Sequence, residues 1–146
     1  MPHRAPTALD RDACLALLTT QSLGRLVFTH RALPDVLPVT YLLDGQRVLI
    51  RVAIGFEAAT AAKGSVVAFE ADDFDALTAT GWSVTIVGRA QEITHPDERL
   101  KALIRDLSSW GGLGRDLLLS VAVEKITGHR LTVAPRPARV QTPENV

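Results

Sequence analysis

Six stretches of this sequence have the composition of β-strands, and turn residues separate them. They lie at residues 24–30, 36–43, 47–53, 65–72, 82–93 and in the first part of 117–133. These stretches are apolar or alternating and rich in β-branched residues. Between two of them, Asp44–Gly45 is a strong signal for a tight hairpin. Because a sheet with many strands in a short chain tends to curl until its edges meet, the sequence predicts a mainly β (α+β) fold. We expect an antiparallel barrel of about six strands with short peripheral helices.

Three short helices are expected outside the barrel. The first covers residues 9–21, with Asp10 as its N-cap. The second is the alanine-rich stretch 56–63, and the third starts at Pro96 and ends near residue 107.

The proposed strands contain two irregular positions. Pro38 suggests a sheet edge or a bulge, because proline cannot donate a hydrogen bond to a neighbouring strand. Residues 127–129 suggest a turn followed by a short extension.

One domain at residues 10–134 is expected in this chain of 146 residues. Residues 1–9 are expected to be loose, and the proline-rich residues 135–146 to form a tail that is disordered or packed on a partner. The 16 basic and 16 acidic side chains cancel, so the charge indicates neither a nucleic-acid nor a membrane partner. No signal-peptide core and no run of roughly 18 apolar residues is evident. With Cys14 as the single cysteine, these features predict a cytoplasmic protein without an internal disulfide.

Clusters that would suggest a metal or a nucleophile are weak. The acids between residues 70 and 75 are interpreted as a solvated turn at the end of a strand. The four histidines share no metal-ligand spacing, and no Ser–His–Asp or Cys–His arrangement stands out. The sequence therefore predicts no metal site, and it leaves the catalytic side chains unknown.

Residues 50–60 raise the question of an anion site. Gly55 ends a strand-like run and a helix follows, so unpaired backbone N–H groups could face a phosphate. Glu57 in the first helical turn opposes a bound phosphate, although an acid there also stabilises the helix by a few tenths of a kcal/mol. Arg51 lies inside a strand, where a guanidinium needs an anionic partner. That partner is a cofactor phosphate, or it is Glu57 or another acid; the sequence leaves these alternatives open.

An ordered series of motifs runs from about residue 10 to residue 133. It comprises SLGRLVF, LPVTYLLDGQRVLIR, Gly55–Phe56–Glu57, VAFEADDFD, TGWSVTIVGRAQEI and ITGHRL. The series resembles the pyridoxamine 5′-phosphate oxidase-like family, the FMN-binding split barrels. It is most similar to the branch of small bacterial flavin or deazaflavin reductases and nitroimidazole-resistance-type proteins. The resemblance implies a split barrel and a homodimer with the flavin in a groove between the two barrels.

The resemblance also implies a set of cofactor-binding residues. They are Leu37, Pro38, Val39, Thr40, Ile50, Arg51, Gly55, Phe56, Glu57, Trp82 and Ser83. The first four would offer backbone groups to the isoalloxazine ring, and the next five would approach the ribityl phosphate. The last two would lie near the ring or its phosphate end, in the same or the other subunit.

Two functional hypotheses follow. The first is an FMN- or deazaflavin-binding oxidoreductase that transfers hydride or electrons to a small organic substrate. The family commonly has a lysine where this chain has Glu57. The second hypothesis is therefore a non-catalytic binding or regulatory module that has lost FMN phosphate binding, or that holds haem or another planar ligand. Oxidation of pyridoxamine phosphate is a third, weaker hypothesis, because no clear second basic cluster is available for a phosphorylated substrate.

Overall fold

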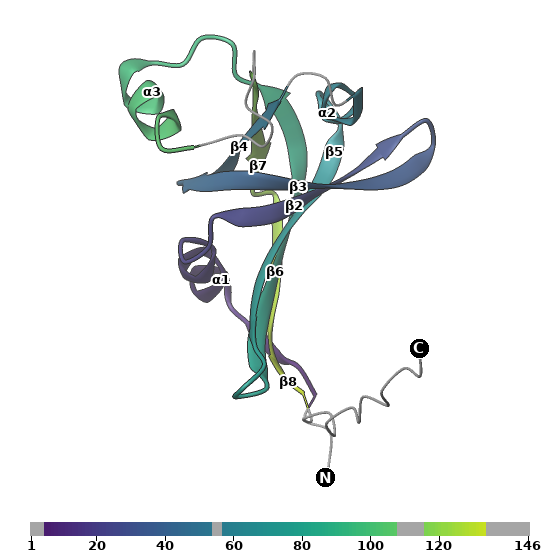
Figure 1. The fold of residues 1–146 in the computed structure, drawn as a ribbon, viewed down its shortest axis with the longest axis vertical. Helices are drawn as coiled ribbons and strands as arrows, with labels where there is room; N and C mark the ends of the chain where they lie inside the picture. The colour runs from purple at the N-terminus through teal and green to yellow at the C-terminus, as the bar shows by residue number, and fades with distance from the viewer. Residues whose placement is uncertain (1–4, 54–56, 108–115, 134–146) are drawn as a thin grey trace, which may run out of the picture.

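The computed structural model describes residues 5–53, 57–107 and 116–133. In chain order the elements are β1 (Thr7–Leu9), α1 (Arg11–Leu18), β2 (Leu23–His30), β3 (Leu33–Asp44), β4 (Arg47–Ala53), α2 (Glu57–Ala62), β5 (Val66–Asp75), β6 (Thr80–Glu92), α3 (Glu98–Ile104), β7 (Asp116–Ala122) and β8 (Lys125–Thr132) (Figure 1). Strands dominate, and the three helices are short.

Six strands close a ring in the order β6–β5–β2–β3–β4–β7. The ring closes at β6, whose first part pairs with β5 and β8 and whose residues Ala90–Glu92 pair with β7. A Cβ atom on Gly88 would lie 1.7 Å from the carbonyl oxygen of Ala122, so β6 needs glycine where it passes β7. The predicted antiparallel barrel of about six strands is confirmed. β8 and β1 extend the sheet beyond the ring.

The turn predicted at residues 127–129 is wrong. These residues lie inside β8, where they pair with residues 83–85 of β6, and the chain turns between β7 and β8 at residues 123–124 instead. Gly128 serves another purpose, since a Cβ there would lie 2.5 Å from the Cys14 Sγ atom. The glycine lets α1 pack closely on β8 rather than marking a turn.

The N-terminal segment also differs from the expectation. Residues 7–9, expected to be part of a loose end, form β1 and pair with residues 128–130 of β8. Residues 135–146, expected to form a tail, lie outside the described residues.

Two hairpins project from the ring in different directions, β2–β3 and β5–β6 (Figure 1). The Asp44–Gly45 hairpin signal is confirmed between β3 and β4, where Gly45 has a φ of +59° and Asp44 pairs with Arg47. Pro38 lies in the part of β3 that pairs with β2 alone, because pairing with β4 begins only at Thr40. The expected sheet edge at this proline is therefore confirmed.

The barrel interior is filled by the inward-facing side chains of all six ring strands. Tyr41 and Phe69 are its largest fully buried members, and their rings meet edge to face at 4.7 Å. The Tyr41 hydroxyl donates a 2.6 Å hydrogen bond to the Leu18 carbonyl oxygen, which ties the end of α1 to the core. Full burial of side chains of this size stabilises the fold by about 1.5–3 kcal/mol each.

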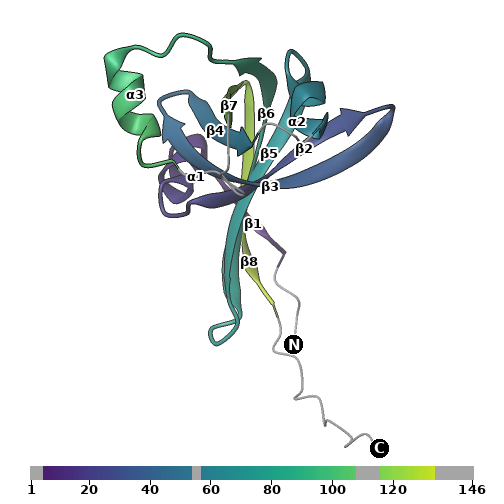
Figure 2. The ribbon, with the colours of Figure 1, turned by 45° about the horizontal axis from the view of Figure 1, so that its top comes forward.

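Helix α3 covers the outside of the sheet, whereas α1 and α2 bury residues in the barrel core (Figure 2). Asp10 caps α1 as predicted, accepting a 2.8 Å bond from Ala13 N. The third helix begins at Glu98 rather than Pro96, with Asp97 as its N-cap. It covers a second apolar cluster, centred on Leu49, Leu100 and Leu107. None of the described helices is long and apolar enough to span a membrane.

Candidate functional site

The predicted cofactor residues point to two opposite faces of the sheet. Side chains alternate between faces along a strand, and Val39, Ile50 and Trp82 are buried on the inner side. We call the opposite side, directed away from the barrel core, the outer face. The alternation places one set of predicted residues on the outer face: Pro38, Thr40, Arg51 and Ser83. It directs another set inward: Leu37, Val39, Ile50 and Trp82.

The edge of β3 offers backbone groups, which is what the resemblance implied for residues 37–40. Within the described part of the chain, no strand pairs with residues 33–39 on the side away from β2. A strand edge presents N–H and C=O groups to any partner that lies along it. The outer-face side chains next to this edge belong to Pro38, Thr40 and, across the β3–β4 ladder, Arg51.

Arg51 is held by groups of the protein itself. Its Nε donates a 2.7 Å bond to Asp116 Oδ2, and its Nη1 donates a 2.8 Å bond to the Leu107 carbonyl oxygen. Of the two alternatives left open by the sequence, pairing with an acid is therefore the one observed. The acid is Asp116, which lies just before the strand expected from residue 117 onward.

The predicted phosphate turn falls largely outside the described residues. Gly55 and Phe56 are not among them, and Glu57 is described only as the first residue of α2. Their role in holding a phosphate therefore stays a prediction.

A charged cluster on the outer face was not anticipated. Arg25 Nη1 lies 3.4 Å from Glu70 Oε1 and 3.1 Å from Asp72 Oδ2. Glu70 and Asp72 lie within β5, in agreement with the strand expected at residues 65–72, and β5 continues to Asp75 where a solvated turn was expected. Burial raises the pKa of Glu70 to about 7; hydrogen bonding to Asp72 and the charge of Asp72 act in the same direction, and Arg25 opposes them.

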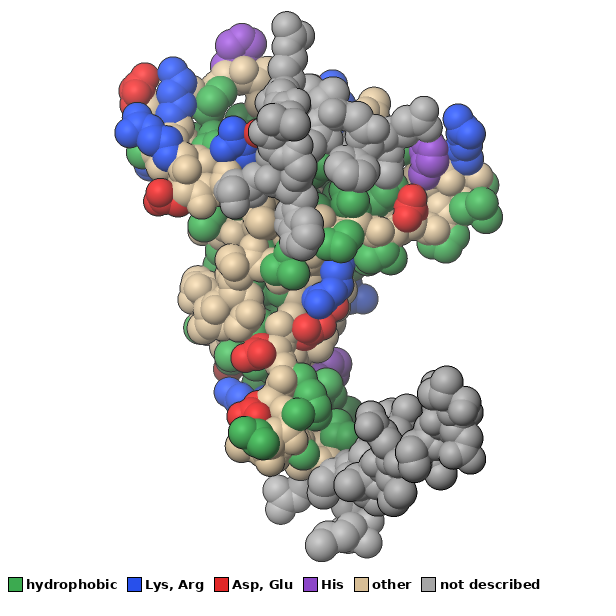
Figure 3. Space-filling model, viewed as in Figure 1, with side chains coloured by type: hydrophobic (Ala, Val, Ile, Leu, Met, Phe, Trp, Pro, Cys, Tyr) green, Lys and Arg blue, Asp and Glu red, His purple; other side chains and the backbone are tan. Residues whose placement is uncertain are grey.

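The cluster belongs to a row of residues that crosses five strands. Arg25 faces Pro38 of β3 on one side and Glu70 on the other, and the row continues to Thr85 and Thr127. On the face shown in Figure 3, acidic and basic side chains lie next to one another in the middle of the molecule, with hydrophobic side chains above and below them.

Trp82 and Ser83 are separated by the alternation of β6. Ser83 lies on the outer face, where it pairs with Asp72. Trp82 is only 7% exposed and lines a cavity of about 360 Å³ on the opposite side. Asp73 and Arg130, its partners on the neighbouring strands, also line this cavity. One chain therefore does not bring the Trp82 side chain to the face that carries Thr40 and Arg51.

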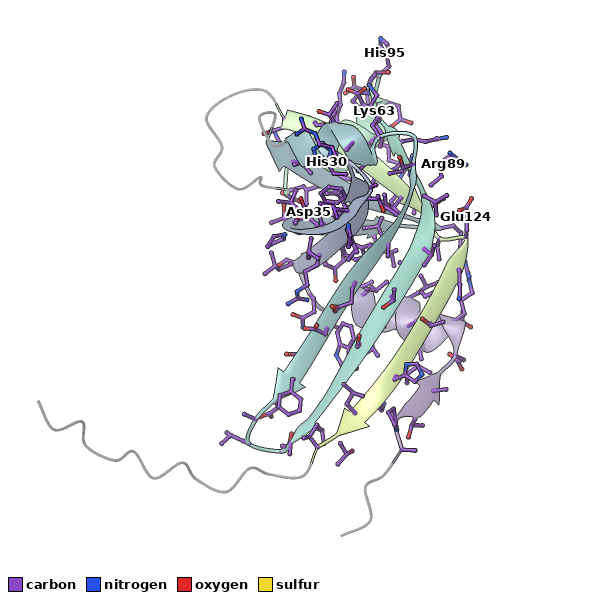
Figure 4. The ribbon with its side chains drawn as sticks, turned by 90° about the vertical axis from the view of Figure 1, so that its right-hand side faces the viewer. His30, Asp35, Lys63, Arg89, His95 and Glu124 are labelled. Atoms are coloured by element: carbon purple, nitrogen blue, oxygen red, sulfur yellow. The ribbon has the colours of Figure 1, made fainter. Side chains whose placement is uncertain are left out.

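A second cavity of about 470 Å³ lies over β7, where Ser120 and Ala122 form part of the lining. Arg89 and Glu124 line it as well, and they lie close together in Figure 4, with Glu124 Oε2 accepting a 3.1 Å bond from the Arg89 backbone N. Among the residues that the structure describes, no three His, Cys, Asp or Glu side chains gather as metal ligands would.

Comparison with known proteins identifies the family. The pyridoxamine 5′-phosphate oxidase family model matches residues 10–130, which is most of the chain. The chain belongs to this family. An uncharacterised protein of Mycobacterium tuberculosis is 36% identical to this member over 138 residues, covering 91% of this chain and 90% of that protein.

Solved structures of similar proteins share the fold. The FAD binding protein from Mycobacterium smegmatis is 32% identical, with a TM-score of 0.71 over 88% of this chain and 100% of that chain. A conserved protein of unknown function from Corynebacterium diphtheriae is 30% identical, with a TM-score of 0.71 over 89% of this chain and 100% of that chain. The pyridoxamine 5′-phosphate oxidase-like split barrel expected from the motif series is thus confirmed.

Proposed function

We propose that this pyridoxamine 5′-phosphate oxidase-like protein is a flavin-dependent oxidoreductase that acts on a small organic substrate in the cytoplasm. The observation that carries the proposal is its 32% identity to a FAD-binding protein over 88% of the chain. A bound flavin supplies hydride or electron transfer. The protein then needs to supply only binding, orientation and electrostatics.

The open edge of β3 is the proposed contact for the flavin ring. Residues 37–39 there have no neighbouring strand on one side within the described chain, so their backbone groups can meet the polar edge of a planar ligand. Inward-facing Val39 fixes the strand in the core, which keeps that edge in place.

We propose FAD rather than FMN as the flavin with the higher affinity. FMN ends in a phosphate monoester, which carries close to two negative charges at neutral pH and therefore gains most from an uncompensated cation. Arg51 is already paired with Asp116 at 2.7 Å, so less of its charge is available to such a group. FAD divides its negative charge between two phosphates and adds contact surface through its adenosine.

We further propose a homodimer formed through the outer face. Four large hydrophobic side chains on this face are more than a third exposed: Leu23, Val36, Val66 and Phe74. Exposed apolar side chains that share one face favour burial against a partner. A dimer formed through this face leaves Trp82 on the opposite side of the sheet, away from the interface, so the role that the resemblance implied for Trp82 stays a prediction.

A visible spectrum of freshly purified full-length protein, followed by mass spectrometry of any released ligand, tests the proposal. We expect the purified protein to show a flavin spectrum. If it is purified without a ligand, we expect micromolar or tighter binding when FAD, FMN and a deazaflavin coenzyme are titrated separately, and FAD should bind most tightly. An Asp116→Asn variant should bind FMN severalfold more tightly, because it removes the carboxylate that neutralises Arg51.

The rival hypothesis makes the opposite predictions. A non-catalytic module would stay colourless and bind none of the three flavins. In that case Glu57→Lys should create measurable FMN binding where the wild type has none, and screening with haem would test the alternative planar ligand. Failure of all three flavins with both the wild type and Asp116→Asn would refute the flavin proposal.

A further inference from the structure

The Arg25–Glu70–Asp72 cluster contains one more negative group than positive groups. The Arg25 guanidinium contacts both carboxylates through the same Nη1 atom, at 3.4 Å and 3.1 Å. One cation shared in this way cannot compensate two carboxylates fully, and Glu70 is mostly shielded from water, with 23% of its side chain exposed. The arrangement favours retention of one proton, as in other pairs of carboxyl groups that share a site.

The cluster lies beside the strand edge proposed for the flavin. Pro38 pairs with Arg25, and Arg25 pairs with Glu70, so Glu70 is two strands away from β3 on the same face. Neighbouring strands are about 4.8 Å apart, which places the backbone of Glu70 roughly 10 Å from that of Pro38. A charge on Glu70 is therefore felt by an anionic ligand that lies along β3.

We propose that Glu70 takes up a proton when an anionic flavin binds to the outer face, so that flavin affinity depends on pH. This inference rests on the proposed flavin site. With both carboxylates ionised the cluster has a net charge of −1, and it repels the flavin phosphates. Protonation of Glu70 brings the cluster to a net charge of zero and removes that repulsion.

Other charged groups face the cluster from several strands. Asp72 and Arg25 contact Glu70 directly, while β3 and β6 present the uncharged Pro38, Thr40, Ser83 and Thr85. The charged or titratable side chains of the same face are Lys125 and His129 on β8, Arg47 and Arg51 on β4, Arg89 on β6 and Asp116 on β7. His129 is an ionisable side chain on the same face, so it requires a control of its own.

The size of the effect follows from separation and screening. At about 10 Å in an environment of intermediate dielectric, with a Debye length of about 8–10 Å, one unit charge changes the affinity of an anion by roughly three- to tenfold. Flavin binding should therefore be three- to tenfold tighter at pH 6 than at pH 8.5.

Isothermal titration of the full chain with FAD tests the inference. Titrations near pH 7 in two buffers with different heats of ionisation report the number of protons taken up when FAD binds. We expect a measurable uptake of no more than one proton per bound FAD. Glu70→Gln should show no proton uptake at this pH and an affinity that stays close to the low-pH wild-type value from pH 6 to 8.5. His129→Asn should keep the wild-type pH dependence.

A readout without ligand separates this inference from the proposed function. Carbon-13 NMR of the apo protein, with Glu70 assigned through Glu70→Gln, should show its carboxyl titrating near pH 7. Flavin binding that is independent of pH, or a Glu70 that titrates below pH 5, overturns the inference and leaves the flavin proposal intact. Absence of FAD binding at every pH overturns both.

Discussion

Replacing Glu70 with Gln should stabilise the folded protein at alkaline pH and leave its stability nearly unchanged at acidic pH. Glu70 shares Arg25 with Asp72. Burial, followed by hydrogen bonding to Asp72 and the charge of Asp72, raises the pKa of Glu70 from an ordinary 4.5 to about 7. Glutamine keeps the size and the hydrogen-bonding capacity of the side chain and removes its charge, so the variant isolates the cost of ionising this carboxyl in the fold.

The sign follows from the direction of the pKa change. The folded state holds the Glu70 proton more tightly than the unfolded chain does, so the favourable contribution of this group is complete below about pH 4.5. It is lost as the pH rises to about 7. The difference between the two pKa values corresponds to about 3 kcal/mol, since each tenfold change in acidity is worth about 1.4 kcal/mol. Because water still reaches part of the side chain, we expect about 1–2 kcal/mol.

Urea denaturation of the wild type and of Glu70→Gln at pH 5, 6, 7 and 8.5 measures this difference. The two free energies of unfolding should be similar at pH 5 and should diverge up to pH 7–8, with the variant the more stable. Glu98→Gln is the matched control, because Glu98 is an exposed acid of α3 that pairs only with Lys101 among the contacts described. A difference that is constant across the pH range, or a variant less stable at pH 8.5, would refute the reasoning.

Three further substitutions test other parts of the fold. Tyr41→Phe should lower the free energy of unfolding by about 1–3 kcal/mol, because the Leu18 carbonyl loses a 2.6 Å buried hydrogen bond; chemical denaturation measures it. Gly88→Ala should fail to give a cooperatively folded barrel, judged by circular dichroism and size exclusion, because its Cβ would lie 1.7 Å from a β7 carbonyl oxygen. Asp44→Asn should be less stable than the wild type at pH 7, and the difference should shrink as the pH falls below 3.8. Hydrogen bonding from Arg99 is the main cause that lowers the Asp44 pKa, so this stabilisation is present above the ordinary value of 3.8 and is lost as the pH falls.

The sequence allowed the barrel to be predicted because its determinants are local. Alternating apolar residues, the turn at Gly45 and the cap at Asp10 each depend on a few neighbouring positions. The turn predicted within β8 was wrong for a non-local reason. A glycine such as Gly128 is typical of a turn, but here glycine is needed because Cys14 of α1 packs against this position. The sequence alone does not show which segments will meet.

The arrangement of the site residues depends more strongly on the register between paired strands, which the sequence does not show. Arg25 and Glu70 are 45 positions apart and meet only because β2 and β5 pair in one particular alignment. Asp116 lies just before the strand expected from residue 117 onward, so its ion pair with Arg51 could not be anticipated. Strand alternation was available from the sequence, however, and it already implied that adjacent residues such as Trp82 and Ser83 cannot present side chains to the same face.

The Arg51–Asp116 pair and the Arg25–Glu70–Asp72 cluster suggest two different routes by which the outer face could accept an anion. In the first, a phosphate competes with Asp116 for Arg51 and no proton is taken up, so this route adds no dependence of affinity on pH between 6 and 8.5. In the second, Glu70 gains a proton and affinity falls as the pH rises. The two variants separate the routes: Asp116→Asn should raise affinity equally at all pH values, and Glu70→Gln should raise it only at high pH. If both variants behave as described, the two charged groups act independently on one ligand, and their effects on the free energy of binding should add in the double variant.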